Sequence, residues 1–312
     1  MGTTLLWVGF NAFILSAIAL DLFVFSRRTH KVSLGEAGAW SAVWISLAIA
    51  FGFGVLRYSG YQPALQFFTG YLIEKAMSVD NLFLFLIIFR SFAVADRLQH
   101  RILEWGILGA LLMRGVMILA GVELIRQFSW ILYLFGAFLL YAGIHMLFIR
   151  KEKIRPQENA IFRFASRHLR VTRDYSDGDF FVRKDRKLYA TPLFLVVLVV
   201  EITDVTLAVD SIPAVFGITR DPFIVYTSNV FAILGLRALY FLLAGVLDRL
   251  RYLTVGLSFV LLFIGAKMIA EPWIHIPEHI SLPVVVAILL LALLASLAFP
   301  SPKTKKTEPI SS

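Results

Sequence analysis

Residues 70–81 read GYLIEKAMSVDN and residues 199–211 read VVEITDVTLAVDS, and both stretches place carboxylates inside otherwise apolar runs. An ionised carboxylate costs about 2.5 to 3.5 kcal/mol at the centre of a lipid-facing helix. Acids that a membrane protein retains despite this cost have one of three roles: they line a polar cavity, pair with internal cations or bind an ion. The two stretches are therefore a candidate site, whose acids are Glu74, Asp80, Glu201, Asp204 and Asp210.

The composition around these stretches is that of a membrane protein. The chain is 59% hydrophobic and 16% charged, and its mean hydropathy is +0.78. Several runs approach the ~20 apolar residues that cross a bilayer. The absence of cysteine excludes disulfides, thiolate metal sites and cysteine nucleophiles. The sequence predicts an all-α polytopic membrane protein with nine spans, near residues 5–25, 38–58, 66–90, 103–122, 129–149, 190–217, 224–246, 254–271 and 281–299.

The formal net charge of +9 is concentrated in alternate loops, which favours membrane orientation over nucleic-acid binding. The loops after the odd-numbered spans and the C-terminal tail are rich in Lys and Arg, whereas the opposite loops offer only Arg57, Arg126 and Arg220. Excess Lys and Arg stay cytoplasmic. We expect a multi-pass membrane protein with its N-terminus outside and its C-terminus in the cytoplasm.

The spans fall into two blocks, residues 1–149 and 190–299, separated by a basic cytoplasmic loop at 150–189. Apolar residues and arginines between 161 and 170 have the spacing of a helix on an anionic membrane surface, and FFVRKDRKLY at 180–189 predicts a short two-stranded hairpin. The loop is a solvated linker or, alternatively, a gate or a contact with lipid headgroups. The tail at 300–312 is rich in Pro, Ser, Thr and Lys, which predicts disorder.

Internal similarities indicate a repeat. EKAMSVDN aligns with DVTLAVDS, ILG recurs at 107–109 and 233–235, and LLYAGIHML at 139–147 resembles LLFIGAKMI at 261–269. Spans three to five thus repeat as spans six to eight. Because the third and sixth spans run in opposite directions, the repeats have inverted topology, the arrangement of many secondary transporters whose ion sites lie near the midplane.

Helical geometry restricts how the acids can converge. At about 100° per residue, Glu201 and Asp204 share a face, whereas acids six residues apart differ by about 120°. Pro213 predicts a kink that frees a backbone carbonyl near Val209 as a further ligand. In the third span, we expect Glu74 to lie nearer the outer mouth.

The chemistry of these residues favours a hard or borderline divalent cation. Carboxylates, with neutral oxygens from Asn81, Ser211 and Asn229, suit Mn²⁺, Mg²⁺ or Ca²⁺, whereas zinc and copper draw His or Cys. Alternatively, the acids only hold helices together by pairing with cations inside the spans. These cations are Lys75, Arg114, Arg237 and Lys267, and the arginines could also compete with a transported cation for the site.

Two other polar residues inside the spans have simpler explanations. Asp21 lies near Arg27 and Arg28, and ion pairing or snorkelling at the cytoplasmic face accounts for it. His145 aligns with the second repeat's Lys267, which favours a polar role at a helix end or interface over metal ligation.

Four strings resemble the TerC family of bacterial integral membrane proteins, and in particular its Alx-like branch. They are TGYLIEKAMSVDN (69–81), FFVRKDRKLYATPL (180–193), VVEITDVTLAVDSIPAVFGIT (199–219) and TSNVFAILGLRALYFLLAG (227–245). The resemblance runs from the first span through the ninth. It implies a location in the bacterial inner membrane, kinship with exporters of lysine and manganese, and a role in Mn²⁺ export with the five acids as the metal path. The family name refers to tellurium resistance.

We therefore expect a secondary transporter that exports divalent cations, Mn²⁺ first among them, in exchange for protons that the same carboxylates can bind. We expect no enzymatic activity and no prosthetic group. One alternative is a membrane scaffold in metal or tellurite stress that transports nothing. Another is an intramembrane aspartyl protease built on Asp80 and Asp210, which the absence of a GxGD segment around either residue disfavours.

Overall fold

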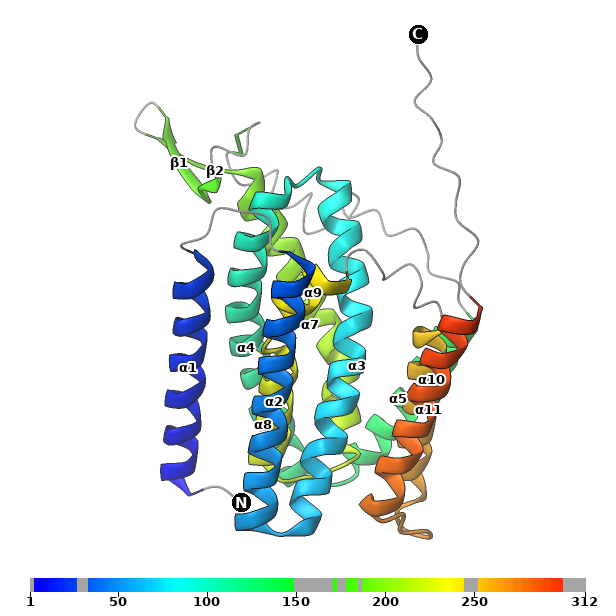
Figure 1. Cartoon of the computed structure of the whole chain (residues 1–312). Helices are drawn as coiled ribbons and strands as arrows, with labels where there is room; N and C mark the ends of the chain where they lie inside the picture. The colour runs from blue at the N-terminus through cyan, green and yellow to red at the C-terminus, as the bar shows by residue number, and fades with distance from the viewer. Residues whose placement is uncertain are drawn as a thin grey trace.

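The computed structural model describes residues 3–26, 33–148, 171–172, 178–184, 187–243 and 252–299, without the side chains of residues 22–26, Asp80 and Lys184. Figure 1 shows the whole chain. Several expectations lie outside the described residues. They are the surface helix and most of the basic loop at 150–189, the disordered tail at 300–312, and the pairing of Asp21 with Arg27 and Arg28.

The described chain forms a bundle of helices with one small hairpin (Figure 1). The helices are α1 (Thr4–Ser26), α2 (Leu34–Ser59), α3 (Tyr61–Ser91), α4 (Asp96–Gln127), α5 (Ile131–Phe148), α7 (Pro192–Phe216), α8 (Pro222–Ile233), α9 (Leu236–Leu243), α10 (Leu253–Ala270) and α11 (Glu278–Ala298). The strands β1 (Phe181–Lys184) and β2 (Lys187–Ala190) pair antiparallel, with Phe181 opposite Ala190. The predicted hairpin is therefore confirmed.

Within the described residues, seven helices are long and apolar enough to cross a membrane: α1, α2, α4, α5, α7, α10 and α11. The pair of α8 and α9, bent by 41° at a short break, makes an eighth candidate. The 31-residue α3 is not among them, and it carries Glu74, Lys75 and Asp80 in its interior. Each expected span contains at least one helix, but nine crossings and the inverted repeat stay predictions.

Local sequence signals fix several helix ends. The Ser33 side chain accepts a hydrogen bond from the Glu36 amide at the start of α2, and Asp221 accepts from the amides of Phe223 and Ile224 at the start of α8. Gly60, at a φ of 94°, ends α2 and leads directly into α3. These ends set the positions along the bundle of the polar residues on α3 and α8.

The helices are interrupted at a place that the sequence does not indicate. The helix α7 continues through Pro213, because a proline in the last turn removes little of the hydrogen-bond ladder. The break lies instead between α8 and α9, where Gly235 has a φ of 78°. The side chain of Trp44 on α2 packs so closely there that a Cβ on residue 235 would lie 2.7 Å from its ring. Only glycine meets both conditions without strain.

The charged residues of α3 lie between three apolar clusters. Phe67 and Tyr71 belong to a cluster with α1, α2 and α8, while Ile73 and Met77 pack with α5, α7 and α10. Further along α3, residues from Leu82 onward pack against α4, α7 and α9. Glu74 and Lys75 therefore form a polar layer in the middle of the bundle, where packing shields it from water.

Candidate functional site

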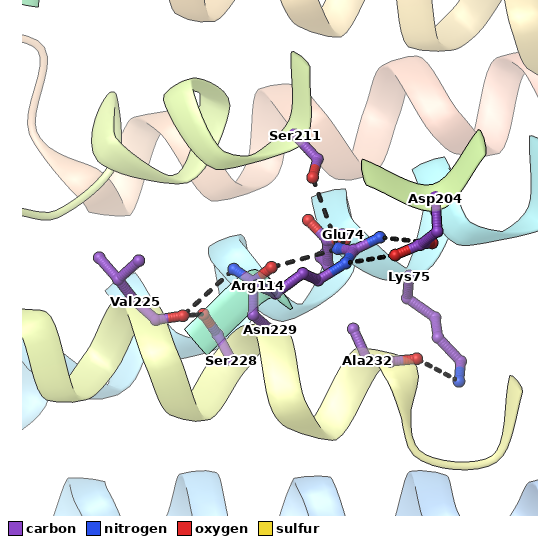
Figure 2. A network of polar contacts seen from close by, with 9 residues as sticks. All are labelled: Glu74, Lys75, Arg114, Asp204, Ser211, Val225, Ser228, Asn229 and Ala232. Carbon is purple, nitrogen blue, oxygen red and sulfur yellow. Dashed lines mark hydrogen bonds and ion pairs between the residues drawn. The ribbon is translucent and has the colours of Figure 1, made fainter. Parts of the chain in front are cut away.

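Arg114 of α4 is the centre of the polar layer. It is 2% exposed, and its guanidinium group points toward side chains of α3, α7 and α8 (Figure 2). A buried guanidinium is stable only where carboxylates and other acceptors surround it. The sequence supplies these acceptors from three helices.

Two carboxylates pair with Arg114. Glu74 of α3 is 0% exposed and forms an ion pair with Nη1. Asp204 of α7 is held through two bonds, one from Nε to Oδ2 at 3.3 Å and one from Nη2 to Oδ1 at 3.2 Å. Two predicted auxiliary oxygens complete the set, because Nη1 also donates to Asn229 Oδ1 at 3.3 Å and to Ser211 Oγ at 3.5 Å. Glu74 and Asp204, which align between the two similar stretches of sequence, thus meet at one cation.

The position of Glu74 differs from the expected one. A residue at an open outer mouth would be solvated, whereas Glu74 is fully enclosed and faces the centre of the site. The reason is that α3 runs between the apolar clusters at this point, with Ile73 and Met77 buried on either side. Glu74 therefore belongs to the central layer.

Glu201 shares the face of Asp204, as helical spacing predicts, but lies one turn away from the guanidinium. Its side chain rests on Gly106 and Gly109 of α4, and a Cβ at Gly106 would lie 3.9 Å from Oε1. Among the described side chains, neither buried carboxylate oxygen has a hydrogen-bond partner. A buried carboxyl group without a donor is far more stable with a proton than without one.

The described contacts of Arg114 do not include Asn81 or Asp210. The side chain of Asp80 is outside the described part, and Asn81 is buried on α3 without being one of the described partners of Arg114. Asp210 lies about 120° around α7 from Asp204. The described residues hold no group of three or more His, Asp or Glu side chains placed to bind a metal.

The described contacts of Lys75, Arg237 and Lys267 are with groups other than the five acids. Lys75 donates to the backbone carbonyls of Ala232 and Leu234, at 3.1 and 3.3 Å. Arg237 of α9 bridges Asp21 of α1 and Glu104 of α4, at 2.6 and 2.7 Å. Asp21 is therefore bound to an internal arginine.

Lys267 of α10 forms a third buried pair. Its Nζ lies 2.7 Å from Glu278 Oε1 and 3.0 Å from Ser281 Oγ, both on α11. The pair borders a cleft of about 280 Å³ whose polar lining includes Gln66, Arg220, Lys267, Glu271, His275 and Glu278. The lining also includes residues 216–220, at the turn between α7 and α8. This turn lies at one end of the bundle (Figure 1).

Sequence reasoning missed Glu104 and Glu278 as members of buried pairs. Glu104 lies at the very start of the expected fourth span, and Glu278 precedes the expected ninth span, which begins at 281. Acids at span ends are common and carry no signal by themselves. The useful signal is the unmatched cations Arg237 and Lys267, each of which needs a carboxylate within reach.

The fold and the site together define a polytopic helical membrane protein with a buried, oxygen-rich centre built from charged residues of separate helices. A model of the protein family described as "Integral membrane protein TerC family" matches residues 59–305 of the chain. The chain belongs to this family, as its motifs indicate.

Relatives of similar length match nearly all of the chain. A protein of Escherichia coli (strain K12), named "Putative membrane-bound redox modulator Alx", is 47% identical over 300 residues, which cover 93% of this chain and 94% of that protein. An uncharacterized membrane protein of Myxococcus xanthus is 46% identical over 297 residues, which cover 95% and 93%. One from Rickettsia bellii is 39% identical over 290 residues, which cover 93% and 96%. No solved structure matches the chain.

Proposed function

We propose that this protein exports divalent cations, with Mn²⁺ as the preferred cargo, across the bacterial inner membrane. One observation carries the proposal: Glu74 and Asp204, from the two similar stretches, converge with Ser211 and Asn229 on the guanidinium of Arg114. Carboxylate and neutral oxygens are the types of ligand that hard divalent cations prefer. Resemblance to the Alx-like branch supports Mn²⁺ among such cations.

In this proposal, Arg114 takes the place of the cargo between transport cycles. Two carboxylates and one guanidinium sum to a charge of −1, and exchange of the guanidinium for Mn²⁺ brings the cluster to zero. The entering cation therefore replaces a charge that the protein already stabilises, and no bare carboxylate is left in the membrane. Asp80 and Asp210 would add ligands at other depths of the path.

The proton side of the exchange is assigned to Glu201. Its carboxyl group lies one helical turn from Asp204 and has no described partner, so it is suited to carry a proton when no metal is near. A cation at Asp204 would favour loss of that proton by Coulomb interaction. Metal and proton would then move in opposite directions.

The proposed orientation places the N-terminus outside and the C-terminus in the cytoplasm, because the basic residues follow the odd-numbered spans. The cleft near Lys267 then lies at the outer end and serves as an exit vestibule. The bridge from Asp21 through Arg237 to Glu104 lies toward the cytoplasmic end and must part before a cation can enter. The basic segment at 150–189 would face anionic lipids.

The Alx relatives are named for redox modulation. A chain without cysteine cannot act through thiol chemistry. Export of a redox-active metal would change the redox state of the cytoplasm indirectly, so the name and the proposal are compatible. A scaffold that transports nothing is the alternative, and it makes no use of an oxygen cage around Arg114.

Flux into proteoliposomes tests the proposal. Purified protein is reconstituted with a Mn²⁺-quenched dye inside the vesicles, and quenching is followed after Mn²⁺ is added outside. Vesicles with the protein should quench faster than empty vesicles and faster still with an opposing proton gradient. A scaffold gives the rate of empty vesicles, and that result would refute the proposal.

A further inference from the structure

The break between α8 and α9 exposes backbone carbonyls inside the bundle. The helix α8 has 12 residues, so at 1.5 Å per residue its last turn lies about 18 Å from its start, well inside a hydrocarbon core about 30 Å thick. The last carbonyls of a helix have no partner within that helix and carry its negative dipole end. In lipid such groups need another partner.

That partner is the ammonium group of Lys75. Its Nζ donates to Ala232 O at 3.1 Å (Figure 2). It also donates to Leu234 O at 3.3 Å. The ammonium is a compact positive charge on a flexible stem. It contacts only neutral oxygens among the described atoms, because the carboxylate of the adjacent Glu74 is engaged by Arg114.

We propose that this break is a second cation site, separate from the Arg114 centre, and that it accepts a monovalent alkali cation when Lys75 is not in it. Carbonyl oxygens of an unwound segment and the C-terminal end of a half-helix are ligands for such ions in membrane proteins. Neutral ligands match a single positive charge, whereas a divalent cation requires carboxylates. Lys75 acts as a tethered substitute for the ion.

The position of Lys75 connects this site with the centre. Glu74 and Lys75 are consecutive residues of α3, and they hold α4 and the α8–α9 break, respectively. A shift of α3 that withdraws Glu74 from Arg114 also withdraws Lys75 from the carbonyls. An alkali cation bound at the second site therefore stabilises the α8–α9 break in the conformation in which Lys75 has left the carbonyls.

Substitution of Lys75 tests the site without any transport assay. Lys75→Ala removes the ammonium and leaves room, whereas the matched control Lys75→Met removes the charge but keeps the volume filled. Thermal unfolding of each purified protein is measured in N-methyl-D-glucamine chloride, NaCl and KCl at equal ionic strength, without Mn²⁺. Failure of Mn²⁺ export therefore has no bearing on the result.

The Ala variant should unfold at a lower temperature than the wild type in N-methyl-D-glucamine. It should recover by about 3 °C or more in Na⁺ or K⁺, with saturation as the ion concentration rises. The wild type and the Met variant should respond equally to all three salts. An Ala variant without a specific Na⁺ or K⁺ response, or a Met variant with the same response, would overturn the proposal and leave Lys75 as a structural helix cap.

A second measurement covers an Ala variant that does not survive purification. Native membranes that contain it are heated in the three salts, and the fraction that remains soluble after detergent extraction is measured. Selective protection by Na⁺ or K⁺ supports the site. Equal loss in all three salts contradicts it.

Discussion

Asp204→Asn is the most direct perturbation of the Arg114 centre. The substitution keeps the size of the side chain and one acceptor oxygen, but it removes a charge that is held by two bonds of 3.3 and 3.2 Å. Removal of one partner from a buried pair costs about 3 to 5 kcal/mol when the other charge is left alone. Here Glu74 remains as a counter-charge, so we expect a loss nearer to 1.5 to 3 kcal/mol, typical of a charged hydrogen bond.

The same loss applies to a cation that replaces the guanidinium. At about 1.4 kcal/mol per factor of ten, 1.5 to 3 kcal/mol corresponds to a roughly 10- to 100-fold weaker interaction. Mn²⁺ export at concentrations below saturation should fall by about that factor. The assay is the rate of dye quenching in proteoliposomes, with thermal unfolding measured in parallel to confirm that the variant is folded.

Glu123→Gln is the matched control. It converts an acid to an amide on α4, the helix of Arg114, at an exposed position whose described contact is with Gln127. It should leave both flux and unfolding temperature unchanged. Wild-type flux in Asp204→Asn would refute the role of the centre, and an equal loss in Glu123→Gln would assign the effect to something other than the site.

Three further outcomes are expected. Gly235→Ala should destabilise the protein by about 2 to 4 kcal/mol, because alanine is strained at a φ of 78° and meets the Trp44 ring; an unchanged unfolding temperature would contradict the description of the break. A reporter active only outside the cytoplasm should work when fused after Arg220 and be silent near Arg183, and the reverse pattern would reverse the direction of transport. Mn²⁺ binding should release protons and weaken as pH falls, which calorimetry in two buffers of different ionisation enthalpy can measure; binding that is flat from about pH 6 to 8.5 would exclude shared carboxylates.

The sequence predicts local features of the site well. The shared face of Glu201 and Asp204 follows from helical spacing, and both side chains do face α4. The alignment of Glu74 with Asp204 suggests equivalent positions, and both residues meet at Arg114. Helical periodicity follows from the spacing of residues along the chain, and internal similarity follows from comparing two segments of the same chain. A single sequence is therefore enough to detect both.

The choice of partners across helices could not be predicted in the same way. Four internal cations and several acids allow many pairings, and packing decides between them. Arg237 pairs with Asp21 and Glu104 because α1, α4 and α9 meet at that point. The helix break was also missed, since it depends on the approach of Trp44 to Gly235, a contact between residues nearly 200 positions apart.

In the proposed mechanism, the internal cations explain how a carboxylate-rich path can exist without its cargo. Arg114, Arg237 and Lys267 each neutralise acids that would otherwise be buried alone, and Lys75 does the same for carbonyls. A transported cation must therefore compete with a charge already in place, and this competition lowers its apparent affinity. Weak affinity suits an exporter, because a site that held Mn²⁺ tightly would remove metal the cell needs and release it slowly outside. In the proposed mechanism, the arginine at the centre thus sets the concentration at which export begins.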